Sequence, residues 1–425
     1  MTARPLGLPM ANLPEHISRP DIKERLTLMA VAAFVYVAVP IISGESRRPI
    51  GHFPQLAQAF LQGSFSFEIP PDSRRGPDEL IPNPDPSRYY CAYPPLPAVL
   101  LLPFVAVIGT ALKVETACRV VSVVNIFLFA ACIRRLPRRL GMTPLEAPAR
   151  VALNVLFAFG TVCWHNAEIG GDWHLAHAVA LAAMLLAMRE WLAGNRPFVI
   201  GCFVGLAILT RPTAALSGLF FIIPLVRTRV VPQLVKLSAG PAFAILLFAL
   251  YNNARFGSPF DFGYDRMLLR GLGAELMREY GQFHPRFVPG NAFWFFLAPP
   301  WPTAGGRFPF VGYDPHGLSL FLATPAFLYV FAAFKRHRRC VYDAAVGIAA
   351  CLVPLLLYFN TGFAQFGHRF SMDYLPLVMV LVVAGMGSRP GKLAYFLVAA
   401  SVAIQAIGVL LDPQTTLPPW LMPSP

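Results

Sequence analysis

The stretch IGGDWHLAHAVALAAMLLAM, from Ile169 to Met188, joins a polar segment to an apolar run that approaches the length of one bilayer crossing. Comparable apolar runs recur along most of the 425-residue chain, of which 56% is hydrophobic and only 13% is charged. The mean hydropathy is +0.55. This composition excludes an ordinary soluble domain and predicts an all-α polytopic membrane protein.

The apolar runs predict about eleven transmembrane helices within a single integral membrane domain, residues 1–425. The predicted spans cover residues 26–43, 117–133, 151–164, 174–193, 197–210, 213–226, 237–251, 316–334, 341–358, 374–386 and 393–411. No cleavage pattern of small residues follows the first run, so we expect it to remain as a span.

Basic residues favour one orientation of these spans. Residues 1–25 and the loops 134–150, 189–196, 227–236, 335–339 and 389–392 hold 20 Lys and Arg against 5 Asp and Glu. Because Lys and Arg concentrate on the cytoplasmic side, we expect these loops and the N-terminus to be cytoplasmic. The net charge of +13 is then mostly a topology signal, and nucleic acid is excluded as a partner. This assignment requires the proline-interrupted segment 93–112 to lie along the interface instead of spanning.

Two long segments then face outward. Residues 44–116 form a first outer loop with interfacial helices, and residues 252–315 form a second long outer loop. Segments of this length are too long to be simple connectors, so we expect them to build the functional face.

Ionisable residues gather at the predicted outer ends of the spans, where burial in lipid would be costly. They are Arg119, Asp172, Arg211, His368, Arg369 and Asp373. Such a set suits transfer of a group from a lipid phosphate, because cations hold the phosphate charge while a carboxylate accepts the proton of an attacking hydroxyl. Arg119, Arg211 and Arg369 are the candidate cations, and Asp172, Glu45 or another outer acidic residue is the candidate carboxylate that accepts the proton. The alternative is that the arginines only reach toward lipid headgroups.

Asp172, His174 and His177 have a spacing that can also hold a divalent ion, with His165 and Glu168 nearby. Two other interpretations compete with a metal site. In one, Asp172 caps a helix that begins at Trp173; in the other, the histidines are interfacial hydrogen-bond donors. We therefore assign no metal ligand, and a divalent cation stays open as a cofactor.

Seven motifs occur in a fixed order along the chain. They are HFPQLAQAFLQG (52–63), YYCAYPPLPAVLLLPF (89–104), CRVVSVVNIF (118–127), GGDWHLAHAVALA (170–182), GLAILTRPTAAL (205–216), YNNARFGSPFDFGY (251–264) and FGHRFSMDYLPLVM (366–379). Their order and topology together resemble the GT-C superfamily of polytopic glycosyltransferases, which includes protein O-mannosyltransferases and lipid A aminoarabinose transferases.

The resemblance implies a polyprenyl-phosphate sugar donor, an inverting transfer to a glycan, lipid or protein acceptor, and a bacterial inner (plasma) membrane with the active face outward. It implies that Arg119 is the first charged residue of the second span and that Asp172 lies at the outer start of the fourth span, both within the site. It also implies that Arg211 contacts the lipid phosphate, and that Arg369 precedes a late span. His52, His174 and His368 are further candidates for substrate binding.

One departure from the family pattern concerns the acid expected just after the first span. There the chain reads RRPIGHF, with Pro49 and Ile50 at the expected position and Glu45 several residues earlier. Either Glu45 serves from a shifted loop, or another acid such as Asp172 serves, or the chain is a non-catalytic relative that binds or helps export lipid-linked sugars. A secondary transporter is disfavoured, because no inverted repeat is visible.

Overall fold

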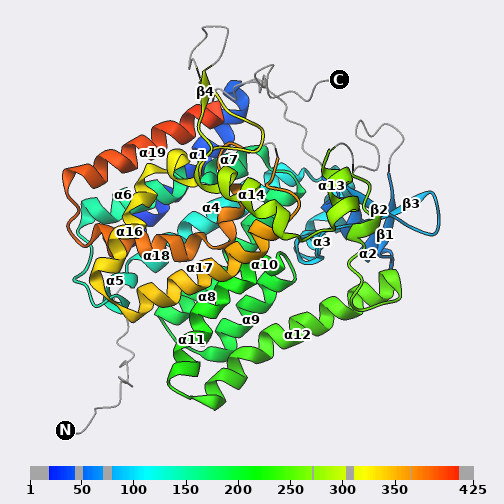
Figure 1. Cartoon of the computed structure of the whole chain (residues 1–425), viewed down its shortest axis with the longest axis horizontal. Coiled ribbons are helices and arrows are strands. Elements are labelled where there is room, and N and C mark those ends of the chain that lie inside the picture. Colours follow the sequence, from blue (N-terminus) through cyan, green and yellow to red (C-terminus); the bar gives the residue numbers. More distant parts are fainter. Residues whose placement is uncertain are drawn as a thin grey trace.

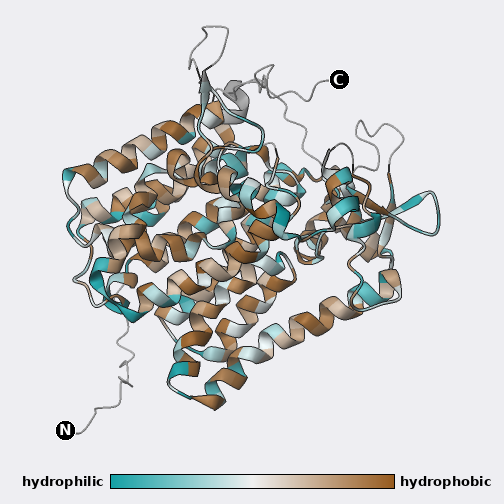
Figure 2. Cartoon of the chain, viewed as in Figure 1, coloured by the Kyte–Doolittle hydropathy of each residue, from teal (hydrophilic) through white to brown (hydrophobic). Residues whose placement is uncertain are grey.

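The computed structural model describes residues 19–43, 51–69, 79–269, 272–302, 311–363 and 365–410. The chain forms a bundle of helices that run side by side, with a small sheet and several short helices gathered at one end (Figure 1). The bundle helices are mainly hydrophobic, whereas hydrophilic residues gather in the connecting segments (Figure 2). The fold is therefore all-α apart from two small antiparallel sheets within the described residues.

Six helical segments in the described part of the chain are each long and apolar enough to cross a bilayer. They are α4 (Val114–Ile133), the consecutive α6 (Ala147–Phe159) and α7 (Val162–Ile169), α8 (Asp172–Leu192), α12 (Val231–Phe256), α17 (Arg339–Leu357) and α19 (Lys392–Leu410). The chain is thus a multi-pass integral membrane protein, as the composition predicts.

The remaining predicted spans fall on other helices, several of them short or broken. They are α1 (Arg19–Ser43), α9 (Pro197–Ile208), α10 (Pro212–Ala215) with α11 (Leu219–Arg227), α15 (Leu320–Ala323) with α16 (Tyr329–Ala333), and α18 (Leu375–Met386). Prolines at the first helical positions of α9 and α10 set where these helices begin, since proline lacks the N–H that a helix interior needs. The number of crossings, about eleven, stays a prediction.

The first long loop folds into an amphipathic helix, a small sheet and a second helix. Its elements are α2 (Phe53–Leu61), β1 (Ser66–Glu68), β2 (Leu80–Pro82), β3 (Arg88–Cys91) and α3 (Leu96–Ile108). The strands are antiparallel in the order β1-β3-β2, and Tyr90 of β3 pairs with Ser66 and Ile81. The segment expected to be an interfacial helix is α3, which contains Pro103 and packs on α2.

The second long loop lies at the same end of the bundle. Its Leu268 exchanges backbone hydrogen bonds with Glu79 and Leu80 at the start of β2. Figure 1 shows α13 toward this end of the bundle, whereas the short basic helix α5 lies at the opposite end. The first loop also contains η1 (Gly109–Ala111). The short elements outside the first loop are α5 (Leu136–Arg139), η2 (Leu216–Gly218), η3 (Tyr264–Arg266), α13 (Leu272–Tyr280), η4 (Pro285–Phe287), α14 (Val288–Phe296), β4 (Trp301–Pro302), β5 (Val311–Gly312), η5 (Pro325–Leu328), η6 (Phe334–Arg336) and η7 (Arg369–Asp373). The two long loops therefore meet over one end of the bundle.

The core of the bundle is centred on α8 and α18, whose side chains are almost entirely buried. Helix α8 packs between α4 and α9, and α18 packs between α16 and α17. Helices α9 and α12 approach very closely, because a Cβ atom added at Gly240 would overlap the backbone of Gly201. This crossing fixes α12, whose far half carries Phe248 to the site described next.

Candidate functional site

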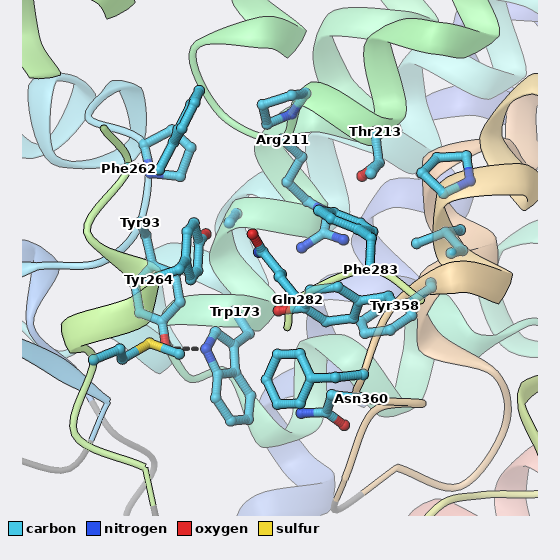
Figure 3. A pocket seen from close by; sticks show the side chains of 18 of the residues that line it. Tyr93, Trp173, Arg211, Thr213, Phe262, Tyr264, Gln282, Phe283, Tyr358 and Asn360 are labelled. Atoms are coloured by element: carbon cyan, nitrogen blue, oxygen red, sulfur yellow. Dashed lines mark hydrogen bonds between the residues drawn. The ribbon is translucent and has the colours of Figure 1, made fainter. Parts of the chain in front are cut away.

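A cavity of about 350 Å³ lies where the two long loops meet the bundle. Figure 3 shows its side chains converging from segments that are far apart in the sequence. The polar and charged side chains of its lining are Glu79, Tyr93, Trp173, Thr210, Arg211, Thr213, Tyr264, Gln282, Tyr358, Asn360 and Arg369. Phenylalanines 248, 262, 283, 359 and 370 supply much of the apolar wall. The cavity is thus aromatic, with one carboxylate and two guanidinium groups among its described residues.

Arg211 is held in place by a buried carboxylate. Its Nε donates to Asp373 Oδ1 over 2.8 Å, and its Nη2 donates to Asp373 Oδ2 over 3.1 Å. The Asp373 side chain is fully buried, and it also accepts from Thr213 Oγ1 at 2.6 Å and lies 3.1 Å from His177 Nδ1. The two parallel bonds fix the plane of the guanidinium group, so the N–H groups that they leave free have a defined direction.

Arg369 is the second cation, and it differs from Arg211 in its partners. It is buried, and its Nη1 lies 3.4 Å from His174 Nε2 and 3.4 Å from the carbonyl oxygen of Phe363. Its guanidinium carbon lies 5.1 Å from the ring centroid of Trp173. Within the described residues no carboxylate pairs with it. A buried cation without a counterion is costly, so the cavity favours an anionic ligand next to Arg369.

Glu79 is the one acidic side chain of the described cavity lining. Tyr93 donates its hydroxyl to Glu79 Oε2 over 3.1 Å, and the indole N–H of Trp173 donates to the Tyr93 oxygen. Burial raises the pKa of the Glu79 carboxyl to about 7, and the Tyr93 hydrogen bond partly opposes this rise. Glu79 can therefore accept a proton near neutral pH.

The backbone of Glu79 is also held firmly. Its φ is +66°, an uncommon conformation for a residue with a side chain. Its N–H donates to the carbonyl oxygen of Leu268 in the second long loop, over 2.8 Å. Both long loops thus fix the carboxylate.

Asp172 does not cap its own helix, and that interpretation was wrong. Helix α8 begins at Asp172 itself, its N-cap is Gly171, and no side chain caps it. Instead the carboxylate accepts the backbone N–H of His52 at 2.6 Å and that of Phe53 at 3.2 Å, at the start of α2. His52 Nδ1 lies 3.4 Å from the same carboxylate. Neither Asp172 nor His52 lines the cavity.

The histidines of the opening stretch do not converge on one point. His177 faces Asp373, and His174 faces Arg369, so each supports a different charged residue. His368 is buried against Phe295 and is not part of the lining. In the part of the chain that the structure describes, no group of three His, Cys, Asp or Glu is placed to hold a metal ion.

The predicted arginines only partly converge. Arg211 and Arg369 share the cavity, whereas Arg119 on α4 donates to the carbonyl oxygen of Glu168 at 3.4 Å and does not line it. Arg119 lies near the start of α4, which packs against α7 and α8, and its guanidinium group contacts the backbone of α7. Glu45 lies outside the described residues.

Sequence reasoning missed Glu79, Tyr93 and Trp173 as parts of the site. Tyr93 and Trp173 lie inside two of the quoted motifs, so their position was a usable signal. Glu79 follows the polar run PPDSRRGPD, and no feature of the sequence distinguishes it from the acidic residues in that run. Only the loop packing distinguishes it.

Comparisons with known proteins agree with this architecture. Residues 90–264 match the model of Glycosyltransferase family 87. A search of curated proteins finds no match. The fold is similar to the crystal structure of ArnT from Cupriavidus metallidurans in the apo state, with a TM-score of 0.51 and 13% identity over 91% of this chain and 62% of that one.

Two other solved structures are similar to a lesser degree. ArnT bound to undecaprenyl phosphate gives a TM-score of 0.49 at 13% identity, covering 92% of this chain and 63% of that one. The oligosaccharyltransferase of Archaeoglobus fulgidus gives 0.48 at 15% identity, covering 92% and 55%. The chain spans less than two thirds of the length of these proteins. The fold of this chain, with its loop helices at one end of a polytopic bundle, is that of the GT-C glycosyltransferases.

Proposed function

We propose that the chain is a membrane glycosyltransferase that moves a sugar from a polyprenyl-phosphate carrier to an extracytoplasmic acceptor. The observation that carries this proposal is the arrangement of Glu79, Arg211 and Arg369 around one aromatic cavity. A carboxylate with a pKa near neutrality and two cations are the groups that this transfer requires. The match of residues 90–264 to Glycosyltransferase family 87 supports the same reaction class.

In the proposed reaction, the oxygen of an acceptor hydroxyl attacks the anomeric carbon of the donor sugar. Its proton passes to the carboxylate of Glu79, while the bond between that carbon and the phosphate oxygen breaks. The phosphate oxygen keeps the bonding electrons, and the released polyprenyl phosphate carries the added negative charge. A single displacement of this kind inverts the configuration at the anomeric carbon.

The two arginines have different parts in this proposal. Arg369 lacks a carboxylate partner within the described residues, so the donor phosphate supplies its counterion. Arg211 is already paired with Asp373, and it contributes oriented N–H groups more than net charge. Hydrogen bonds to the leaving oxygens strengthen as negative charge grows during bond cleavage.

The aromatic wall suits the apolar faces of a sugar ring and the first units of an isoprenoid. Pockets for small ligands are mostly apolar, with a few polar groups that fix orientation. Here Gln282 and Asn360 face the cavity as neutral hydrogen-bonding side chains (Figure 3). They are candidates for contacts with sugar hydroxyls.

The side of the membrane is part of the proposal. Helix α5, in the basic loop, lies at the end of the bundle opposite to β2 and β3 (Figure 1). The cavity residues Glu79 and Tyr93 adjoin these two strands. Because basic loops favour the cytoplasm, the cavity is assigned to the extracytoplasmic face.

The test is to incubate the purified chain in nanodiscs with a panel of radiolabelled polyprenyl-phosphate sugars, with and without Mg²⁺. We expect at least one donor to release its sugar to water or to an added acceptor, and Glu79→Gln to lower that rate by at least about a hundredfold. Glu68→Gln is the matched control, because Glu68 lies on β1 outside the cavity and its side chain is 68% exposed.

The alternative function, a non-catalytic protein that binds or helps export lipid-linked sugars, predicts a different result in the same experiment. It predicts saturable binding of a donor with no release from any member of the panel. Full turnover in Glu79→Gln would show that another group is the base.

A further inference from the structure

We infer that Tyr93 and Trp173 are positioning residues, which hold the Glu79 carboxylate in its proton-accepting orientation through a directional chain of hydrogen bonds. This inference rests on the proposed role of Glu79 as the base. The three side chains come from three segments, namely the loop before β2, the loop after β3 and the first turn of α8. Figure 3 shows Tyr93 and Trp173 side by side, with their hydrogen bond marked.

The direction of this chain follows from the chemistry of its members. An indole nitrogen can only donate a hydrogen bond, so Trp173 donates and the Tyr93 oxygen accepts. The Tyr93 hydroxyl proton is then directed to Glu79 Oε2, 3.1 Å away. A donor that points at a carboxylate oxygen stabilises the ionised form. The described residues give Glu79 Oε1 no hydrogen bond, so this oxygen is the one available to a substrate proton.

Both rings are held by packing that does not involve Glu79. The Tyr93 ring lies 5.9 Å from that of Phe53 and 6.3 Å from that of Trp173. Phe53 is the first residue of α2. Asp172, which precedes Trp173 in the chain, fixes the start of α2 by accepting the backbone N–H of Phe53. Packing against α2 and α8 therefore sets the position of the Tyr93 hydroxyl. The Glu79 carboxylate is oriented by its hydrogen bond to this hydroxyl.

Other charged groups around Glu79 also change the pKa of its carboxyl. The charges of His52 and Arg369 favour its ionised form, whereas the charge of Asp172 opposes it. Burial has the largest effect and raises the pKa of Glu79, and the Tyr93 hydrogen bond is the largest effect that lowers it. Loss of the Tyr93 hydroxyl alone must therefore raise that pKa further.

The first experiment is the pH profile of transfer by Tyr93→Phe, which keeps the ring and removes the hydroxyl. We expect the midpoint of the acidic limb to move upward by about one pH unit, so that the rate at pH 7 falls about fivefold while the rate at high pH is regained. Tyr90→Phe is the matched control, because Tyr90 lies on β3, packs on Phe256 and does not line the cavity. An unchanged midpoint in Tyr93→Phe would overturn the inference.

A double-mutant cycle tests the chain itself. Trp173→Phe removes the indole donor and keeps a smaller aromatic ring next to Tyr93 and Arg369, and it should move the midpoint in the same direction by less than Tyr93→Phe does. Because Trp173 acts through the Tyr93 hydroxyl, the double variant should show no larger shift than Tyr93→Phe alone. Additive shifts would mean that the two side chains act independently.

A readout without turnover separates this inference from the proposed function. Ionisation of Glu79 should change the fluorescence of Trp173, obtained by subtracting the emission of Trp173→Phe from that of the parent protein across pH 5 to 9. The step should be absent in Glu79→Gln and shifted upward in Tyr93→Phe. If Glu79→Gln keeps full transfer activity but the fluorescence step behaves as expected, the role of Glu79 as base fails while the hydrogen-bond chain holds. If Glu79→Gln is inactive and Tyr93→Phe leaves both step and profile in place, the chain fails alone.

Discussion

Asp172 and His52, 120 positions apart, are joined by a 2.6 Å hydrogen bond in which the carboxylate accepts the backbone N–H at the start of α2. A residue at the start of the long apolar helix α8 thus caps α2, the amphipathic helix of the first loop. Backbone N–H groups at a helix start lack partners within the helix. A carboxylate at that position accepts these N–H groups, and its negative charge interacts favourably with the positive end of the helix dipole. Asp172 is therefore assigned a structural part in the site.

The first prediction concerns this contact. Asp172→Ala should destabilise the first loop by about 1 kcal/mol, the usual cost of a lost cap, and increase proteolysis between α2 and β2. Asp172→Asn keeps an acceptor oxygen and should retain most transfer activity. An inactive but normally folded Asp172→Asn, together with an active Glu79→Gln, would return the catalytic role to Asp172.

The second prediction separates the cavity arginines from Arg119. Arg369→Ala should weaken donor binding at least about tenfold, because the donor phosphate loses a cation that has no carboxylate partner among the described residues. Arg119→Ala should bind the donor like the parent protein, because Arg119 does not line the cavity. Equilibrium binding of a labelled polyprenyl-phosphate sugar measures both. Equal losses in the two variants would mean that the donor extends to α4.

The third prediction concerns the pair of Asp373 and Arg211. Asp373→Asn should release the guanidinium group from its fixed plane and leave a partly buried charge without its partner, which lowers stability by about 3 to 5 kcal/mol. We expect a lower thermal midpoint together with a lower kcat. In a cycle with Arg211→Gln, the double variant should be less destabilised than the sum of the single variants. Additive losses would show that the pair is not coupled.

The fourth prediction is the pH dependence of the parent enzyme. Glu79 accepts a proton only when ionised, and burial raises the pKa of its carboxyl to about 7. The value of kcat/KM should therefore fall about tenfold for each pH unit below 7 and level off above it. A profile that is flat between pH 5 and 8 would exclude Glu79 as the base.

The fifth prediction tests how α12 is fixed. Gly240→Val should destabilise the protein by about 1 to 3 kcal/mol, because the added side chain cannot fit against the backbone of Gly201. Donor affinity should fall with it, since α12 carries Phe248 to the cavity. Gly391→Ala is the control, because a Cβ atom added there meets open space. Thermal unfolding in detergent and donor binding measure the two effects.

The amino-acid sequence was enough to predict that the chain is a multi-pass helical membrane protein. It also predicted a helix in segment 93–112, observed as α3, whose place along the membrane interface stays a prediction. These features depend on local properties, namely the length of apolar runs, the distribution of Lys and Arg, and prolines that interrupt helices. The order of the motifs also predicted the GT-C architecture. Arg211 and Arg369 were identified because charge is rare at the ends of apolar spans.

Which side chains meet at the site could not be read from the sequence, because it depends on the packing of distant segments. Asp172 adjoins an apolar span as a catalytic acid would, yet it caps α2. Glu79 has no distinguishing neighbours in the sequence, yet it faces the cavity because packing of the two long loops brings it beside Tyr93. Apolar runs and charges are properties of each segment alone, whereas a site built at the ends of separate segments depends on how all of these segments pack.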